Sequence, residues 1–529
     1  MGDRFGTAVR AGIYATAIVA WILSSPERTH GATLNFAVGT FAEETFDPTM
    51  TSISAAIGVG GGMWNWLTEV TPKGELRPSI ASSWTLEPDG RAWTFKLRDD
   101  VKFHDGSKMT ADDVRFTFLQ GVLRPEAKSS RSAQFRQGIA NVKVIDATTV
   151  RFELSGTWPT LPYDISSQAG TEGIILPKAY IEKVGWATFA KQPVGTGPWK
   201  FVRQQAGDMV EFAAVKDHFA TPPKFDALRL LLVPEESTRL AMLKSGQADI
   251  ADVQVDSLKA AEGAGFKIAE DPQYTSIRIV FPGGHLVPTQ PVHKLEVRKA
   301  LNLAINRNEI VKALFAGRGQ PAAIAPSSTL SIGYPKDLKP YPYNPAEAKK
   351  LLAQAGYPSG FDIRLYAFPL SGFNGHKELA EAVAGYWDAI GVRTTIVLTD
   401  LGAIRPKYVA EPPHSDILGQ TMMFANTGRL NGLDDLSIFW HYTPRGNQRL
   451  AAKGEIDAQM ERAAKAATVE GLAKEVTEAY EILYNNYRGV PIVDGLSAIW
   501  AYGNKLAALG ERRPFRGYVT PDLAMAVPK

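Results

Sequence analysis

The sequence predicts an α/β fold, because strand patterns and helix patterns alternate along most of its length. Residues 92–97 (AWTFKL) alternate apolar and polar side chains with the period of a half-buried strand. Residues 228–233 (LRLLLV) are almost continuously apolar, as in a strand covered on both faces. A helix pattern ending at Gly246 and a short strand pattern at 250–253 follow, which together suggest a parallel crossover. A chain of 529 residues has room for several such domains.

The first 32 residues have the three-part layout of a secretory signal. Arg4 and Arg10 precede an uncharged apolar stretch at 11–23, and a polar segment with Gly31 and Ala32 follows. Thirteen apolar residues extend roughly 20 Å as a helix, which is too short for a comfortable membrane span. We therefore expect residues 1–32 to be a signal peptide, with a retained N-terminal anchor as the alternative.

Composition narrows the class of protein further. The chain has no cysteine, which rules out a disulfide, a thiolate metal site, a cysteine nucleophile and a lipid-modified N-terminal cysteine. Its net charge of +3 is too small, and its Lys and Arg too dispersed, for a nucleic-acid surface. We expect a protein that is secreted to the periplasm, soluble and not lipid-anchored.

The region after the signal is rich in strand patterns. The turn at 87–90 (EPDG) separates the apolar residues Trp84 and Leu86 from the strand at 92–97, which predicts a hairpin. A second hairpin is predicted for 142–145 and 150–154. Between the hairpins, Thr110 caps a predicted helix that carries two aspartates at the positive end of its dipole.

Helices and strands alternate regularly in the C-terminal half. Helical spacing of apolar residues predicts helices at 345–356, 376–390 and 456–487. Strands are predicted at 361–367, 392–398 and 490–493.

The residues give no signature of catalysis or of a cofactor. The chain has no phosphate-binding glycine loop, no nucleophile elbow and no histidines at metal-ligand spacing. The glycine run at 58–62 lacks the strand and helix of a dinucleotide site, and His104 precedes an Asp-Gly turn, so we interpret both as structural. The sequence predicts that the protein is not an enzyme and has no metal or cofactor.

Several long motifs occur in a fixed order. They are Leu76-Arg-Pro-Ser-Ile-Ala-Ser-Ser-Trp84, Trp93-Thr-Phe-Lys-Leu-Arg98, Val101-Lys-Phe-His-Asp-Gly106, Met109-Thr-Ala-Asp-Asp-Val114, Pro193-Val-Gly-Thr-Gly-Pro-Trp-Lys-Phe201, Val297-Arg-Lys-Ala-Leu-Asn-Leu-Ala-Ile-Asn-Arg307 and Tyr343-Asn-Pro-Ala-Glu-Ala-Lys-Lys-Leu-Leu352. With these motifs the chain resembles the extracytoplasmic solute-binding proteins, family 5, which serve peptide, nickel and opine ABC importers. The resemblance covers essentially the whole mature chain.

The resemblance implies a two-lobed periplasmic binding protein of type II, in its large three-subdomain variant. Lobe I would have a core from 33–66, 195–275 and 497–529 and an inserted β-rich subdomain at 67–194, and lobe II would be 276–496. The chain would cross between the lobes near 274–281 and 494–497, which are the expected hinges. A solute that touches both lobes would stabilise the closed form, which then docks on the importer.

One segment bears on the solute. In the peptide-binding members, an aspartate of a Trp-x-Ala-Asp stretch pairs with the α-amino group of the peptide. The comparable segment here is 419–426, with Ala425-Asn426 where Ala-Asp would stand. A neutral Asn426 does not balance a buried ammonium, so we expect that the protein is not a general peptide binder. Its ligand is expected to present a hydroxyl, a carboxylate or an amide at Asn426.

Further candidates for the cleft are one arginine and four aromatic residues. Arg405 is suited to hold a carboxylate with two parallel hydrogen bonds, with a solvated surface arginine as the alternative. We expect the apolar walls of the cleft to come from Tyr274, Phe373, Phe424 and Trp440. For each of them, the alternative is that the side chain is buried in the core. His414 and His441 raise the alternative that the protein binds a metal chelate or haem. The spacing of the two histidines does not favour this alternative.

The resemblance also names the partners. The small-molecule solute, the ABC permease and its ATPase complex in the inner membrane are expected, with the binding protein itself a monomer and no nucleic acid bound. A secreted hydrolase and a chaperone-like periplasmic protein on the same scaffold are the alternative functions.

Overall fold

The computed structural model describes residues 32–41, 44–51, 60, 62–129, 131–324, 329–369, 375–410, 413–441, 450–510 and 523–529. Nearly all of the predicted signal peptide, residues 1–31, lies outside these ranges. Within them, no helix has both the length and the apolar content that a membrane span needs.

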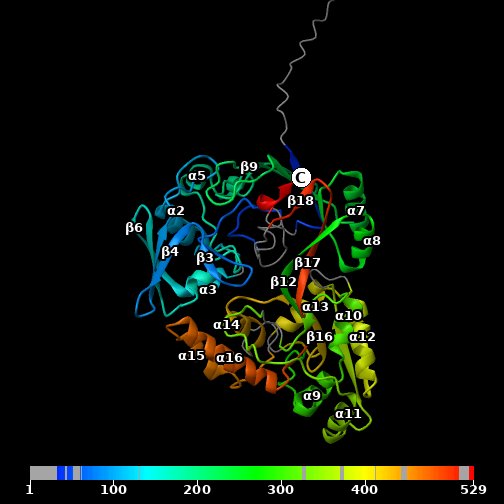
Figure 1. The fold of residues 1–529 in the computed structure, drawn as a ribbon. Coiled ribbons are helices and arrows are strands. Elements are labelled where there is room, and N and C mark those ends of the chain that lie inside the picture. The colour runs from blue at the N-terminus through cyan, green and yellow to red at the C-terminus, as the bar shows by residue number, and fades with distance from the viewer. Residues whose placement is uncertain are drawn as a thin grey trace, which may run out of the picture.

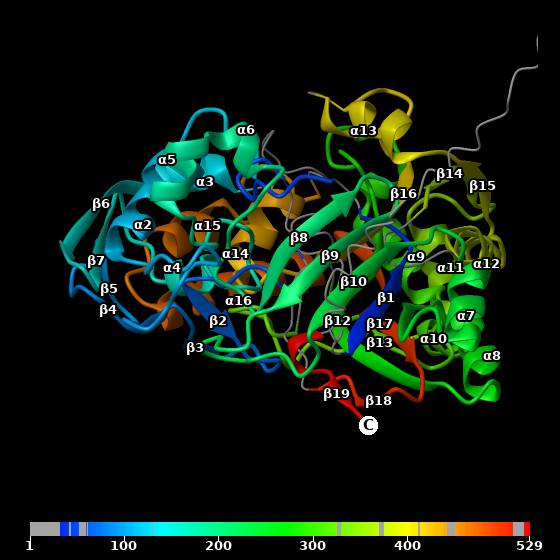
Figure 2. The same ribbon diagram turned by 90° about the horizontal axis from the view of Figure 1, so that it is seen from above.

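The largest sheet among the described residues is a mixed sheet of eleven strands, and it confirms the α/β class (Figures 1 and 2). Its order is β15 (Val392–Leu398), β14 (Phe361–Ala367), β16 (Thr421–Thr427), β12 (Lys267–Val280), β17 (Gly489–Tyr502), β11 (Ile250–Asp252), β1 (Thr33–Val38), β10 (Ala227–Leu232), β9 (Met209–Ala214) and β8 (Trp199–Gln205), with β13 (Gln320–Pro321) paired to β17.

The two longest strands, β12 and β17, connect the two ends of this sheet. Each has 14 residues, and they pair antiparallel along most of their length. The first part of β12 pairs with 498–502 and its last part with 489–496, with register shifts between Asp271 and Arg278. Figure 1 shows both strands running from the upper to the lower part of the molecule. The predicted strand at 490–493 is therefore only the beginning of a much longer one.

Buried apolar residues form four clusters, which supply the names used below. The lobe I core consists of two clusters. One contains Leu34, Trp199, Leu228 and Ile250, and the other contains Ala37, Leu243 and Ala501. The inserted subdomain surrounds the cluster from Leu67 to Ile175, and lobe II surrounds the cluster from Ile277 to Val493. The residue boundaries expected for these parts stay a prediction.

The inserted subdomain contains both predicted hairpins. Its four-stranded antiparallel sheet has the order β4 (Ala81–Leu86), β5 (Ala92–Leu97), β7 (Thr149–Leu154) and β6 (Ile139–Asp146). Helix α2 (Ala111–Phe116) begins with the predicted cap, since Thr110 and Asp113 form a capping box. The subdomain also contains β2 (Thr68–Val70), β3 (Leu76–Pro78), α3 (Ser132–Gly138), α4 (Leu161–Asp164), α5 (Lys178–Val184) and α6 (Trp186–Phe189).

The strands of lobe I follow the predicted parallel crossover with one difference. Strands β10 and β11 do not pair with each other, because β1 lies between them and is parallel to both; α7 (Glu236–Ser245) connects them. The prediction that 228–233 is covered on both faces is wrong. Leu228 and Leu230 are buried in the lobe I core, whereas the alternate residues of β10 are partly exposed.

Lobe II contains the helices between Leu295 and Asn485. They are α9 (Leu295–Leu303), α10 (Arg307–Leu314), α11 (Pro345–Gln354), α12 (His376–Asp388), α13 (Leu401–Val409), α14 (Gly432–Asp435), α15 (Asp457–Ala464) and α16 (Val469–Asn485). The single helix predicted for 456–487 is wrong, because α15 ends at Ala464 and α16 begins anew. The Thr468 side chain accepts a hydrogen bond from the Gly471 N–H and so caps α16.

Two of the ordered motifs hold each other in place. A Cβ at Gly195 would lie 2.2 Å from the Met63 carbonyl oxygen, and one at Gly197 would lie 2.3 Å from that of Gly62. His104 accepts from the Gly195 N–H through Nδ1 (3.2 Å), and its Nε2 lies 2.9 Å from the Gly197 carbonyl oxygen. Burial lowers the pKa of His104 to about 4, so the ring is neutral. This confirms the structural interpretation of His104.

Candidate functional site between the lobes

A buried ionic network joins the inserted subdomain to lobe II. Arg131, just before α3, lies with its Nη2 2.8 Å from Asp164 Oδ1 of the same subdomain and 2.6 Å from Asp434 Oδ2 of α14. Gln134 Nε2 donates to the other oxygen of Asp434 at 3.0 Å. All three charged side chains are nine-tenths buried or more, so the pairs lie out of reach of solvent screening.

Neutral hydrogen bonds cross the same boundary. Asn431 Nδ2 of lobe II donates to Thr160 Oγ1 of the inserted subdomain at 3.0 Å. The Thr157 hydroxyl donates to the Ala464 carbonyl oxygen at 3.4 Å. Figure 1 shows α14, α15 and α16 next to the inserted subdomain, as these bonds require. The two lobes are thus in contact on this side of the sheet.

Beside the network lie buried polar groups that have no hydrogen-bond partner within the described ranges. They are the Arg429 Nε and Nη1 of lobe II and, from one loop of the inserted subdomain, Ser167 Oγ, Thr171 Oγ1 and Glu172 Oε2. Leaving such groups unpaired away from water costs about 1–3 kcal/mol each, and more for a charged group. Polar groups of this kind, supplied by both lobes, are what a bound polar solute needs.

Asn426 lies in β16 directly opposite Ser276 of β12 and is half-buried. Its Oδ1 accepts a hydrogen bond from Arg278 Nη2 at 2.8 Å. Arg278 is fully buried, and burial lowers the pKa of its guanidinium to about 9 although the nearby Asp435 acts in the opposite direction. The surroundings of Asn426 therefore already hold one buried cation.

Comparison with known proteins identifies this architecture. A family model described as bacterial extracellular solute-binding proteins, family 5 Middle, matches residues 75–413. The chain belongs to this family. It is 31% identical to the dipeptide-binding protein of Escherichia coli K12 over 67% of the chain and 68% of that protein. It is 27% identical to heme-binding protein A of Haemophilus influenzae over 79% of each.

Solved structures agree on the fold. The substrate-binding protein CtaP from Listeria monocytogenes matches with a TM-score of 0.81 and 21% identity, over 94% of the chain and 99% of that protein. The family-5 chain is thus a two-lobed solute-binding protein of the type that serves ABC importers. Members of the family are binding proteins, and nothing in the comparisons supports the hydrolase alternative.

The structure places the other predicted cleft residues of this family-5 protein in different surroundings. Phe424 and Trp440 are buried in the lobe II core; Phe424 packs edge-on against Phe368 and Tyr408. Arg405 is exposed on α13. The side chain of Tyr274, whose backbone is in β12, and all of Phe373 lie outside the described residues. A role for any of them in the cleft stays a prediction.

The two histidines considered as metal or haem ligands each lie beside a carboxylate. His414 Nδ1 is 3.3 Å from Asp416 Oδ2, and His441 Nε2 is 3.3 Å from Asp457 Oδ1. Among the described residues there is no group of three His, Asp or Glu side chains that could hold a metal ion.

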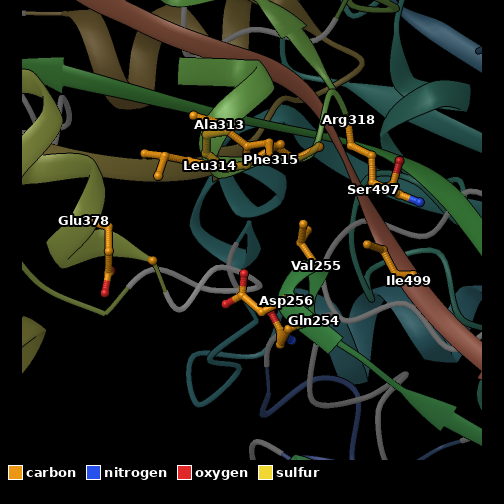
Figure 3. Close-up of a pocket in the computed structure, with 12 residues that line it drawn as sticks. Gln254, Val255, Asp256, Ala313, Leu314, Phe315, Arg318, Glu378, Ser497 and Ile499 are labelled. Carbon is orange, nitrogen blue, oxygen red and sulfur yellow. The ribbon is translucent and has the colours of Figure 1, made fainter. Parts of the chain in front are cut away.

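A cavity of about 330 Å³ lies at the hinge of this solute-binding protein (Figure 3). Figure 3 shows Gln254, Val255 and Asp256 of lobe I opposite Ala313, Leu314 and Phe315 of lobe II, with Ser497 and Ile499 of β17 beside them. Arg318 at its edge pairs with Glu270 at 2.9 Å. Because its walls belong to both lobes, its size must change with the hinge angle.

Sequence reasoning missed the residues that carry most of the buried charge. Arg131, Glu172, Arg429 and Asp434 stand in segments without a recognisable motif, and they come together only through the tertiary fold. Their one signal in the sequence is that charged residues stand among small and apolar neighbours, as in the segment 166–175.

Proposed function

We propose that this chain is the periplasmic receptor of an ABC importer, which captures a small polar organic solute between its lobes and passes it on without a chemical reaction. Family membership, the secretory layout of residues 1–32 and the two strands that cross between the lobes support this proposal. Its partners would be the membrane permease and the ATPase of that importer.

We propose further that the solute does not place a free ammonium at Asn426. The observation that carries this is the 2.8 Å hydrogen bond from buried Arg278 to Asn426 Oδ1. A second cation there would be repelled by Arg278 and would find a neutral amide instead of a carboxylate. The relatives that bind dipeptides or heme therefore do not fix the solute of this chain.

A thermal-shift screen followed by calorimetry tests both parts. The panel contains dipeptides, amino acids, opines, oligosaccharides and aromatic acids. The melting temperature of a receptor should rise by several degrees with one chemical class, because a ligand that binds only the native state stabilises that state by mass action. Tight titration by dipeptides regardless of their sequence would contradict the proposal for Asn426. Stabilisation by no class, or binding of unfolded chains alone, would contradict the receptor itself and favour the chaperone-like alternative.

A further inference from the structure

The inserted subdomain holds one arginine in a fixed position at the lobe boundary. The Arg131 N–H donates to Glu172 Oε1 at 3.0 Å, and its Nε donates to Gln134 Oε1 at 3.0 Å. Its Nη1 donates to the Asp164 carbonyl oxygen at 3.3 Å, and its Nη2 donates to Asp164 Oδ1 at 2.8 Å. All of these partners belong to the inserted subdomain, so the guanidinium keeps its orientation whether or not lobe II is near. The socket is the name used below for Arg131, Gln134, Thr160 and Asp164.

The carboxylate of the socket is held by bonds of its own. Trp158 Nε1 donates to Asp164 Oδ2 at 2.7 Å, and the Thr160 hydroxyl donates to the same oxygen at 2.8 Å. Arg131 therefore has an ionic partner inside its own subdomain. A group that is ordered in advance loses little conformational freedom when it makes a further contact.

Lobe II presents a short helix to this socket, α14, and the residue that caps it; together they are called the plug below. The Asn431 Oδ1 accepts from the Leu433 N–H at 3.2 Å and so caps the helix. A Cβ at Gly432 would lie 2.5 Å from the Ile332 carbonyl oxygen and 2.7 Å from the Val476 side chain of α16. The plug is thus packed closely on lobe II and moves with it.

Plug and socket meet through one ion pair and two hydrogen bonds. Asp434 Oδ2 lies 2.6 Å from Arg131 Nη2, and Asp434 Oδ1 accepts from Gln134 Nε2 at 3.0 Å. Asn431 Nδ2 donates to Thr160 Oγ1 at 3.0 Å. One guanidinium nitrogen is therefore shared between a carboxylate of each lobe. All of these contacts join protein to protein and need no solute.

Opening the lobes would change the surroundings of one of these charges far more than those of the other two. The side chains of Arg131 and Asp164 are 2% exposed and remain paired with each other in an open molecule. Asp434, 8% exposed here, would exchange Arg131 for water. The hydration that a carboxylate loses on burial and the ion pair that it gains are of similar size. Closed and open molecules should therefore coexist before any solute binds.

We propose that plug and socket form a latch that keeps part of the unliganded molecules closed, with the Arg131–Asp434 pair as its main contact. The inserted subdomain then has a function of its own, which is to hold lobe II. A solute meets lobes that already visit the closed form, so less of its binding energy is needed to close them. This inference goes beyond the proposed receptor function, and its test needs no solute.

Distances between spin labels on the unliganded protein test the latch. Labels at Arg115→Cys in the inserted subdomain and Lys474→Cys in lobe II occupy exposed positions of a chain that has no other cysteine. The protein is dialysed exhaustively, and native mass spectrometry confirms that it carries no small molecule. We expect two populations, a narrow one that matches the distance between these positions in the structure and a longer one from open molecules.

Two single substitutions weaken the latch by different means. Asp434→Asn removes the charge that meets Arg131 and keeps an oxygen acceptor. Asn431→Asp keeps a good cap for α14 but places a carboxylate beside Asp164, whose Oδ2 lies 3.4 Å from the present amide nitrogen. We expect each to lower the ratio of closed to open molecules about tenfold or more, because removing or opposing one partner of a buried charge pair has at least this effect.

The matched control is Asp337→Asn, at an exposed position of lobe II, which should leave the ratio at its wild-type value. A wild-type distribution without a closed population would overturn the latch. A ratio in Asp434→Asn equal to that of the control would overturn it too, and Asn431→Asp decides in the same way if Asp434→Asn does not fold. Either result would leave the proposed receptor function standing, because the solute has no part in the measurement.

Discussion

Asp494 is a carboxyl group in buried surroundings that disfavour its charged form. It lies in β17 between the lobes, is 3% exposed, and its Oδ1 has no hydrogen-bond partner among the described residues. Burial raises its pKa to about 7, although a hydrogen bond from the Gly495 backbone acts against this. A carboxyl group at a hinge is thus kept from ionising easily.

This shift predicts a pH dependence of stability. The native state binds the Asp494 proton more tightly than the unfolded state, so this group contributes stability below about pH 4 that is lost as the pH rises to about 7. The change is on the order of 4 kcal/mol. We therefore expect Asp494→Asn to unfold at higher urea than the wild type at pH 8 and at the same concentration at pH 4.

The control for this prediction is Asp208→Asn, at an exposed position. It should follow the wild type at every pH. An Asp494→Asn midpoint that runs parallel to the wild type from pH 4 to 8 would show that Asp494 ionises normally.

At the scale of elements, the ordered motifs act by packing rather than by contact with a solute. The chain at 193–201 passes so close to residues 62–64 that only glycine fits at two positions, and His104 bonds to both of these glycines. The contact joins the end of the inserted subdomain to the lobe I core.

Gly197→Ala should destabilise the protein by about 3 kcal/mol or more, because its Cβ would overlap the backbone of Gly62 and Met63. Urea denaturation measures the effect. Gly156→Ala is the matched control, since its Cβ would meet nothing within 4 Å, and it should change stability by no more than about 0.5 kcal/mol. Equal effects of the two substitutions would contradict this account of the motif.

The elements also show what sequence alone can and cannot predict. Strands β14 and β15 begin and end at the predicted residues, because alternation and flanking glycines are local signals. The break before Thr468 was missed, since the apolar spacing continues across it. The length of β17 was missed too, because pairing with β12 across both lobes, and not its own pattern, keeps it extended.

The candidate site was predictable only in part. The family motif pointed to Asn426, and the structure shows that its Oδ1 accepts a hydrogen bond from Arg278. Arg429 and Glu172 have no pattern around them, and their importance depends on which partners they lack, which only the folded structure reveals.

At the scale of the whole molecule, β12 and β17 connect two lobes that are in contact on one side of the sheet. The contact combines the Arg131–Asp434 ion pair with the hydrogen bonds of Asn431 and Thr157. Opening the lobes must break these bonds and expose the charges to water. A solute that touches both lobes would add to this contact and shift the equilibrium toward the closed form.

Distance measurement between spin labels on the two lobes tests this claim most directly. The chain has no cysteine, so Asp89→Cys and Lys465→Cys, both exposed, give one label on the inserted subdomain and one on lobe II. Lys465→Cys with Lys474→Cys places both labels on lobe II as a control. With the solute bound, we predict one short, narrow distance for the first pair, a longer or broader distribution without it, and no change in the control. An unchanged distance for the first pair on saturation with solute would contradict capture by closure of the lobes.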